Sequence, residues 1–250
     1  MGDMSFVSGT SDSLRPLFNL FWEWLTANAG RPLGGRVVEI GLGPNGFAPF
    51  YAERFKSYIG LDVDDYRDNY RHIPNVEPVI YDGLSMPIED SYADLVVSHS
   101  TFEHIENVAQ VMKETDRLLK TGGLFYLTIN PLYFSSWGSH GTFADNVTKL
   151  PAWDHLDPSS TNFMTDCPPQ MIHNGKKGCY LNKLTMSKLL AVVGEYPWSI
   201  LRLDRMYEHM PVPPFLANCR DFNLTDVFNH DFRMLVKKDA LLTKDGPRFG

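Results

Sequence analysis

Apolar and polar positions along the chain follow two spacings, one typical of strands and the other of helices. Nearly continuous apolar runs predict buried strands at residues 36–41, 58–62, 79–81, 94–98, 124–129, 198–206 and 231–237. Apolar residues three and four positions apart predict helices at residues 13–29, 47–55, 108–119 and 184–193. We expect Gly122 or Gly123 to cap the third helix. Because strands and helices alternate, the pattern predicts a mainly parallel sheet with right-handed crossovers.

The first predicted strand runs into a glycine-rich turn. Its sequence from residue 37 is Val-Val-Glu-Ile-Gly-Leu-Gly-Pro-Asn-Gly. Gly-x-Gly lets the backbone bend tightly and approach a ligand, and the helix that follows offers free N–H groups. Asp62 ends the next strand, at the spacing where a ribose-binding carboxylate is expected. Together these features predict a nucleoside cofactor site.

The glycine spacing alone leaves two cofactors open. Gly41, Gly43 and Gly46 also satisfy the dinucleotide fingerprint, in which a pyrophosphate sits at the helix N-terminus. Glu39, two residues before the first glycine, would repel a diphosphate but accept hydrogen bonds from a cationic amino-acid group. S-adenosylmethionine carries such a group, so Glu39 favours it.

Five segments occur in an order that resembles the class I S-adenosylmethionine-dependent methyltransferases, of the small-molecule type with a methyltransferase-11-like core. They are Glu39-Ile40-Gly41-Leu42-Gly43, Asp62, Tyr81-Asp82-Gly83-Leu84, residues 93–98 and residues 118–124. The resemblance covers residues 36–130, about half the chain. It implies an α/β fold with a Rossmann-like, doubly wound, seven-stranded sheet, mostly parallel with an antiparallel C-terminal edge strand.

The resemblance also implies how the cofactor is bound. Asp62 would hold the ribose of S-adenosylmethionine, and Asp82 would hold its adenine amino group. After methyl transfer the product of the cofactor is S-adenosylhomocysteine. The full predicted set is Glu39, Gly41, Gly43, Asn45, Gly46, Asp62, Val63, Asp82, Gly83, Leu84 and Ser98. In the family the third glycine stands at Asn45, and here it is displaced to Gly46. Because Asn tolerates left-handed backbone, we expect an altered loop with binding retained.

Residues 131–183 change to a segment dense in Tyr, Trp, His, Pro and Gly, which is too long for an ordinary connection. We predict a substrate loop whose pocket is walled by Tyr133, Trp137 and Trp153; a compact plug made by the same rings is the open alternative.

Four histidines are candidates near the reactive methyl group. His140 is the first choice for a general base and His155 the second, with His99 a third candidate. His104 is assigned to the substrate site. For His99 and His104 a hydrogen-bonded structural role is the favoured alternative, and Glu103 is read as a first-turn helical residue.

Size, charge and cysteine content narrow the remaining choices. With 250 residues, 43% of them hydrophobic, the chain is expected to form one domain, with an N-terminal helical segment at 1–34 and the insertion at 131–183. The first helix is expected to pack on the sheet. A second role, as a lid over the cofactor, stays open as an alternative. A net charge of −7 disfavours nucleic acid as a partner and favours a small molecule.

Three sparse cysteines suit a reducing compartment and match no metal motif, so no metal site is predicted. Neither a signal peptide nor a spanning apolar run is visible, and we expect a cytoplasmic protein without a membrane partner. A homodimer is left open.

The predicted function is methyl transfer from S-adenosylmethionine to a small-molecule acceptor, preferentially to oxygen. Two alternatives stay open. A nicotinamide-dependent reductase would share the glycine turn, but no tyrosine has a lysine four residues later, which counts against the short-chain type. A catalytically inactive methyltransferase-like binding subunit would keep the cofactor site without turnover.

Overall fold

A computed structural model describes residues 11–44, 46–140, 151–165, 172–173, 176–177, 180–218 and 223–240. Its main element is a seven-stranded sheet with the strand order β3-β2-β1-β4-β5-β9-β8. The strands are β1 (Arg36–Ile40), β2 (Ser57–Asp62), β3 (Val76–Ile80), β4 (Ala93–His99), β5 (Leu119–Ile129), β8 (Trp198–Tyr207) and β9 (Asn229–Lys238). A separate two-stranded hairpin pairs β6 (Ile172–His173) with β7 (Lys176–Lys177).

The helices are α1 (Ser11–Asn28), α2 (Ala48–Ala52), α3 (Arg67–Tyr70), α4 (Val108–Leu118), α5 (Met186–Val193) and α6 (Leu224–Val227). Three 3-10 turns join them, η1 (Phe102–His104), η2 (Asp154–Leu156) and η3 (Pro214–Asn218). Within the described ranges, none of the helices is both long and apolar enough to span a bilayer.

The sheet has the predicted parallel core. β1 pairs in parallel with β2 and β4, β2 pairs with β3, and β4 pairs with β5. The last strand of the chain, β9, is antiparallel to both β5 and β8. It fills the gap between them, so β8 rather than β9 forms the outer edge. The predicted α/β fold class is confirmed, and the antiparallel strand lies second from that edge.

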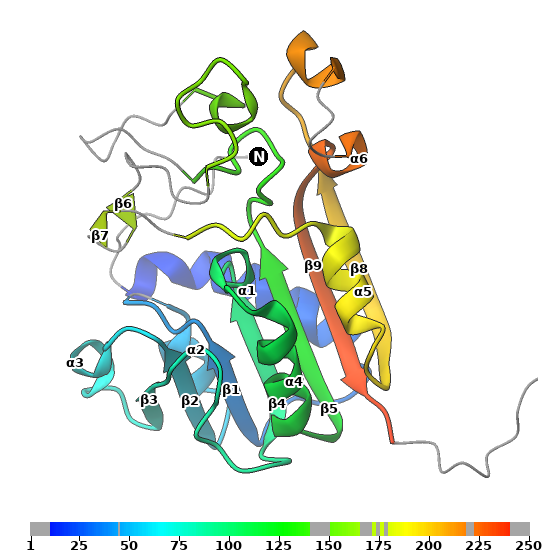
Figure 1. Cartoon of the computed structure of the whole chain (residues 1–250). Coiled ribbons are helices and arrows are strands. Elements are labelled where there is room, and N and C mark those ends of the chain that lie inside the picture. The colour runs from blue at the N-terminus through cyan, green and yellow to red at the C-terminus, as the bar shows by residue number, and fades with distance from the viewer. Residues whose placement is uncertain are drawn as a thin grey trace, which may run out of the picture.

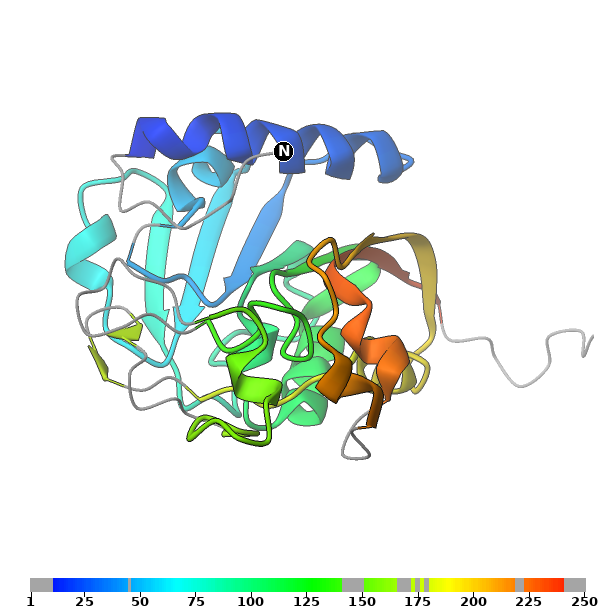
Figure 2. The same cartoon turned by 90° about the horizontal axis from the view of Figure 1, so that it is seen from above.

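Helices cover both faces of the sheet (Figures 1 and 2). On one face α1 and α2 pack against alternate strand residues such as Val37, Tyr58 and Tyr126. On the other face α4 and α5 pack against the residues between them, such as Val38 and Phe125. Because both faces are covered, the strands read as nearly continuous apolar runs, and that is why the sequence predicted them.

Helix α1 crosses one face of the sheet and reaches its far strands (Figure 2). Phe18 and Leu25 are fully buried beneath it. Trp24 Nε1 donates a hydrogen bond to Asp204 Oδ2 on β8 at 2.6 Å, and the guanidinium of Arg233 on β9 lies 4.6 Å from the Trp24 ring centroid. The expected packing on the sheet is therefore observed, and residues 1–10 lie outside the described part.

One predicted cap was wrong. Helix α4 ends at Leu118, and Leu119 is already extended, so neither Gly122 nor Gly123 caps the helix. The reason is strand pairing, because Leu119 lies opposite Ala93 at the start of β4. Gly122 instead has a φ of 77° and bends β5 before its long buried stretch.

A third, smaller apolar cluster lies above the carboxyl ends of β4 and β5. In Figure 1 the green segment that follows β5 rises above the arrowheads of these strands. The cluster consists of Tyr133, Phe134, Trp153, Leu156, Leu181, Leu216 and Val227. Tyr133 and Trp153 are only 2% and 4% exposed. This packing corresponds to the compact-plug alternative for these two rings, and their role as pocket walls stays a prediction.

Candidate functional site

The glycine turn follows β1 at the point where the strand order reverses, which is where ligands bind in open α/β sheets. Gly41 and Gly43 have φ angles of 85° and 60°. A Cβ on Gly41 would lie 2.0 Å from Thr101 Oγ1, so this glycine allows β1 and the segment after β4 to approach closely. A Cβ on Gly43 would meet nothing within 4 Å. Gly43 therefore presents bare backbone to open space, as a cofactor cradle requires.

Asp62 at the end of β2 is joined directly to this turn. Its Oδ2 accepts a hydrogen bond from Gly43 N at 2.9 Å, and its Oδ1 accepts one from Asp64 N at 3.0 Å. Burial raises the pKa of the carboxyl, while the Gly43 amide opposes the rise. The predicted ribose-binding carboxylate therefore lies at the glycine turn, as the motif requires.

Tyr70, the last residue of α3, closes the turn from the other side. Its hydroxyl accepts a hydrogen bond from Gly46 N at 2.8 Å and donates one to Gly43 O at 2.9 Å. Asn45, between these glycines, lies outside the described residues. Sequence reasoning missed Tyr70, because nothing in its local pattern shows that α3 folds back onto the turn.

Glu39 lies in β1 with 1% of its surface exposed. The Tyr58 hydroxyl donates a hydrogen bond to its carboxylate. Burial raises the pKa of Glu39 to about 8; the Tyr58 hydrogen bond opposes the shift and the Asp62 charge adds to it. At neutral pH Glu39 therefore favours its protonated form, and a nearby cationic group would favour the ionised form.

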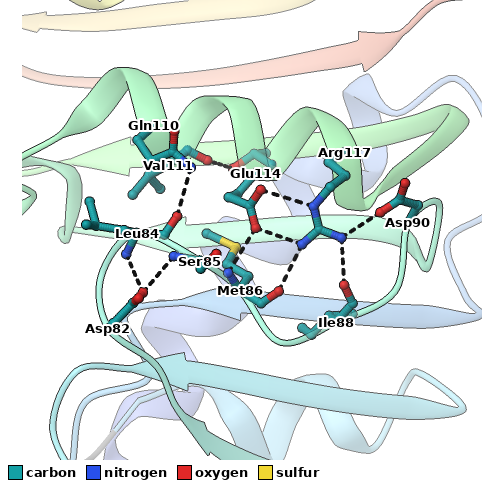
Figure 3. Close-up of polar contacts among 11 residues, drawn as sticks. Asp82, Leu84, Ser85, Met86, Ile88, Asp90, Gln110, Val111, Glu114 and Arg117 are labelled. Atoms are coloured by element: carbon teal, nitrogen blue, oxygen red, sulfur yellow. Dashed lines mark hydrogen bonds and ion pairs between the residues drawn. The ribbon is translucent and has the colours of Figure 1, made fainter.

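Asp82 lies in the loop after β3, and Figure 3 shows how its carboxylate folds back onto that loop. Its Oδ1 accepts hydrogen bonds from Ser85 N at 2.6 Å and Leu84 N at 2.8 Å. These amides hold the pKa of Asp82 below its usual range. The side chains of Asp82 and Leu84 are exposed. A Cβ on Gly83 would lie 3.5 Å from Cγ1 of the exposed Val63, so the loop lies beside the end of β2.

Arg117 on α4 holds this loop in place (Figure 3). Its guanidinium donates to Met86 O at 2.9 Å, to Ile88 O at 2.7 Å and to Asp90 Oδ1 at 2.7 Å. It also donates to both carboxylate oxygens of Glu114, one of which accepts from Met86 N at 2.9 Å. No local sequence pattern indicates this network, because the loop and α4 are distant along the chain.

The three predicted cofactor carboxylates lie at the ends of neighbouring elements. β1, β2 and β3 are adjacent, with Asp62 opposite Ile80. The charge of Asp62 raises the pKa of Glu39, and the charges of Asp62 and Asp82 both add to the raised pKa of Tyr81. Because these three strands are adjacent and parallel, the acids lie along the same edge of the sheet.

Three predicted site residues lie within the protein interior. Ser98 Oγ donates to Ile40 O at 2.9 Å, which ties β4 to β1. His99 lies among aromatic rings, with its Nε2 3.0 Å from the Tyr51 hydroxyl, and burial lowers its pKa to about 3. His155 Nε2 is 2.6 Å from Tyr133 O, and burial lowers its pKa to about 4. Both histidines stay neutral at neutral pH, and their proposed catalytic roles stay predictions.

The loop aromatics are also hydrogen-bonded. The Tyr133 hydroxyl donates to Thr165 O at 2.9 Å and Trp153 Nε1 donates to Pro211 O at 3.0 Å. Trp137 is half-buried. The first bond joins the segment after β5 to residues 151–165, and the second joins residues 151–165 to the loop after β8.

His104 and His140 come together with Glu103. One nitrogen or oxygen atom from each side chain lies within 4.8 Å of the other two. Glu103 is 3% exposed, and burial raises its pKa to about 8, with the Asp231 charge adding to the shift. Two imidazoles and a carboxyl are a donor set that suits either proton transfer or a metal ion. The sequence predicted both histidines here but assigned Glu103 no chemical role.

Comparison with known proteins finds similarity to methyltransferases. Residues 38–127 match the model of a methyltransferase domain family. An uncharacterized methyltransferase of Mycobacterium leprae is 28% identical over 122 residues, 47% of this chain and 45% of that protein. One from Mycobacterium tuberculosis is 26% identical over 121 residues, 47% of each chain. The chain thus spans about half the length of the curated relatives it matches.

Solved structures share the fold over a larger part of the chain. An S-adenosylmethionine-dependent methyltransferase from Clostridium acetobutylicum superposes with a TM-score of 0.58 at 13% identity, covering 89% of this chain and 90% of that one. Another from Mesorhizobium loti gives 0.56 at 15% identity, covering 87% and 97%. At such low identity these likenesses establish the fold.

A doubly wound sheet with a glycine turn and an acid at the next strand end is typical of nucleoside-binding α/β proteins. The match over residues 38–127, the curated relatives and the shared fold make this part of the chain similar to class I S-adenosylmethionine-dependent methyltransferases. These similarities support the family and the enzyme class predicted from the sequence.

Proposed function

We propose that the chain transfers the methyl group of S-adenosylmethionine to a hydroxyl oxygen of a small-molecule acceptor. The observation that carries the choice of oxygen is the cluster of Glu103, His104 and His140. Thr101, two residues before Glu103, packs against Gly41, so the cluster adjoins the cofactor turn. A hydroxyl must lose its proton when it is methylated. Such a cluster can accept that proton as a base, or it can hold a metal ion that displaces the proton.

The residues of the cofactor half fit S-adenosylmethionine. The bare backbone at Gly43 leaves room for the methionine portion, and Glu39 suits its ammonium group. Asp62 and Asp82 would take the ribose hydroxyls and the adenine amino group. When bound, the cofactor supplies an electrophilic methyl group on a sulfonium.

The acceptor half is supported by position and by charge. Glu103 and His104 follow β4, and His140 follows β5, so they lie at the carboxyl ends of neighbouring strands. The segment after β5 and its aromatic cluster lie above these ends, where they can exclude water and orient an acceptor. The net charge of −7 supports a small acceptor rather than nucleic acid.

Incubation with methyl-labelled cofactor and separate panels of small alcohols and phenols, amines and thiols tests this proposal. We expect label in a hydroxyl compound, with an O-methyl signal in the product by NMR. Label found only in amines or thiols would contradict oxygen as the acceptor atom. Cofactor binding without transfer to any panel would support the inactive-subunit alternative.

A further inference from the structure

Glu103 has a buried carboxylate whose environment within the protein is incomplete. Both carboxylate oxygens are buried, and no other described residue hydrogen-bonds to either of them. An ionised carboxylate removed from water without partners is costly, so a native protein either keeps the group protonated or supplies donors, a counter-charge or a metal ion. Asp231 lies close enough to add negative potential. The surroundings of Glu103 thus favour a positive charge.

The two histidines beside Glu103 are oriented by backbone carbonyls. His104 Nδ1 lies 2.9 Å from Tyr180 O, and His140 Nε2 lies 3.0 Å from Pro131 O. A carbonyl only accepts hydrogen bonds, so each of these nitrogens carries a proton. In the neutral form of each imidazole the lone pair is then on Nε2 of His104 and Nδ1 of His140. A histidine that binds a metal commonly donates its other N–H to a carbonyl in this way.

We propose that Glu103, His104 and His140 bind a divalent first-row transition-metal ion. Two imidazoles and one carboxylate leave the remaining coordination positions open for water or substrate. Metal–ligand bonds of about 2.1 Å require the three donor atoms to draw together by roughly 1 Å. His104 and His140 are only partly buried, and their side chains can make this adjustment.

This inference rests on the proposed function and specifies its acceptor chemistry. The acceptor hydroxyl binds an open position on the ion, which acidifies it, and its proton passes to water. The resulting oxyanion forms a bond to the methyl carbon. The carbon–sulfur bond breaks with its electron pair left on sulfur, giving the methyl ether and S-adenosylhomocysteine. No oxidant or reductant takes part.

Cobalt titration of the metal-free chain tests the site without any need for turnover. We expect one equivalent of Co²⁺ with visible d–d bands and with heat in calorimetry. His140→Ala and Glu103→Gln should weaken Co²⁺ binding by at least about tenfold. His72→Ala, at an exposed histidine elsewhere, is the matched control and should bind like the parent. Retained S-adenosylhomocysteine binding shows that each variant is folded.

The proposal is overturned if the parent binds no cobalt, if the variants bind as the parent does, or if thiolate-to-cobalt charge-transfer bands appear. Should Glu103→Gln fail to fold, the X-ray absorption spectrum of the cobalt-loaded parent decides, because coordinated imidazoles are required. Methyl transfer that persists with a chelator and no bound metal would contradict the metal site but not the proposed function. Metal binding without methyl transfer to any acceptor would support the metal site and contradict the proposed function.

Discussion

Tyr70 shows how one side chain can stabilise a cofactor turn. Its hydroxyl makes hydrogen bonds to both Gly43 O and Gly46 N while the residue is 3% exposed. Tyr70→Phe removes both bonds and leaves two backbone groups without their partner. We expect a loss of about 1–3 kcal/mol in unfolding free energy, together with weaker S-adenosylhomocysteine binding. Urea denaturation and calorimetry measure the two effects.

Tyr92→Phe is the matched control. The Tyr92 hydroxyl hydrogen-bonds Ser57 Oγ at 3.1 Å, at the start of β2 and hence away from the turn. The Tyr92→Phe substitution should therefore change cofactor affinity little. If Tyr70→Phe binds the cofactor as tightly as Tyr92→Phe does, the hydroxyl does not position the turn.

Glu39 makes the stability of the chain depend on pH. Its folded-state pKa of about 8 lies above the ordinary value of 4.5 for a glutamate side chain. The folded state therefore keeps a proton that the unfolded state loses. The contribution of protonated Glu39 to the free energy of unfolding is complete below pH 4.5. It is lost as pH rises toward 8, at up to ~1.4 kcal/mol per pH unit.

Glu39→Gln isolates this effect because glutamine keeps the shape but does not titrate. Denaturant unfolding of both proteins between pH 5 and 8 should show the parent losing stability relative to the variant as pH rises. All other titrating groups are shared, so their contributions cancel. Parallel curves would mean that Glu39 is already ionised in the folded state.

Local motifs explain which site residues could be predicted. Gly41, Gly43 and Asp62 belong to a strand–turn–strand unit whose spacing fixes their geometry, so the sequence placed them correctly relative to one another. Tyr70 and Glu103 act through contacts that exist only after the chain has folded. No local pattern distinguishes them from ordinary core residues.

At the scale of elements, α4 holds the loop that carries Asp82. The planar guanidinium of Arg117 reaches two carbonyls of that loop and two carboxylates at once (Figure 3). Lysine at this position keeps the charge but not the fork of donors. We expect Arg117→Lys to cost about 1–3 kcal/mol in unfolding free energy and to speed hydrogen exchange of the Leu84 and Ser85 amides.

Arg71→Lys is the control for that substitution. Arg71 pairs with Asp68 at 3.2 Å, with both side chains mostly exposed, so its loss should change stability by less than ~1 kcal/mol. Equal exchange rates at Leu84 and Ser85 in the two variants would show that the loop does not depend on Arg117.

Elements whose buried apolar residues recur with a clear period were predicted well. Element ends that depend on strand pairing between distant residues were not. The core strands and α4 were recognised because their buried faces recur regularly along the sequence. β3 starts three residues before its predicted position, at Val76, because its first residues are only partly buried and gave no apolar run. The end of α4 was misplaced because Leu119 pairs with Ala93, a contact distant in sequence.

At the scale of the whole molecule, the sheet brings two chemistries to one edge. The carboxyl ends of β1, β2 and the loop after β3 carry the cofactor acids, and the segments after β4 and β5 carry the cluster of Glu103, His104 and His140. The alternation of strands and helices predicted the parallel sheet that brings these ends together, whereas the grouping of Glu103 with the two histidines was not predicted. The packing of residues 131–140 and 151–165 was left open, because irregular loops have no period and their contacts are set by the folded surface.

The most direct test of this account is calorimetric titration of the parent chain, Asp62→Ala and Asp68→Ala with S-adenosylhomocysteine. We predict one saturable site in the parent, an affinity at least about tenfold lower in Asp62→Ala, equivalent to about 1.4 kcal/mol, and no change in the exposed control Asp68→Ala. Binding by Asp62→Ala that equals the parent, or no binding by the parent, would contradict the shared cofactor site.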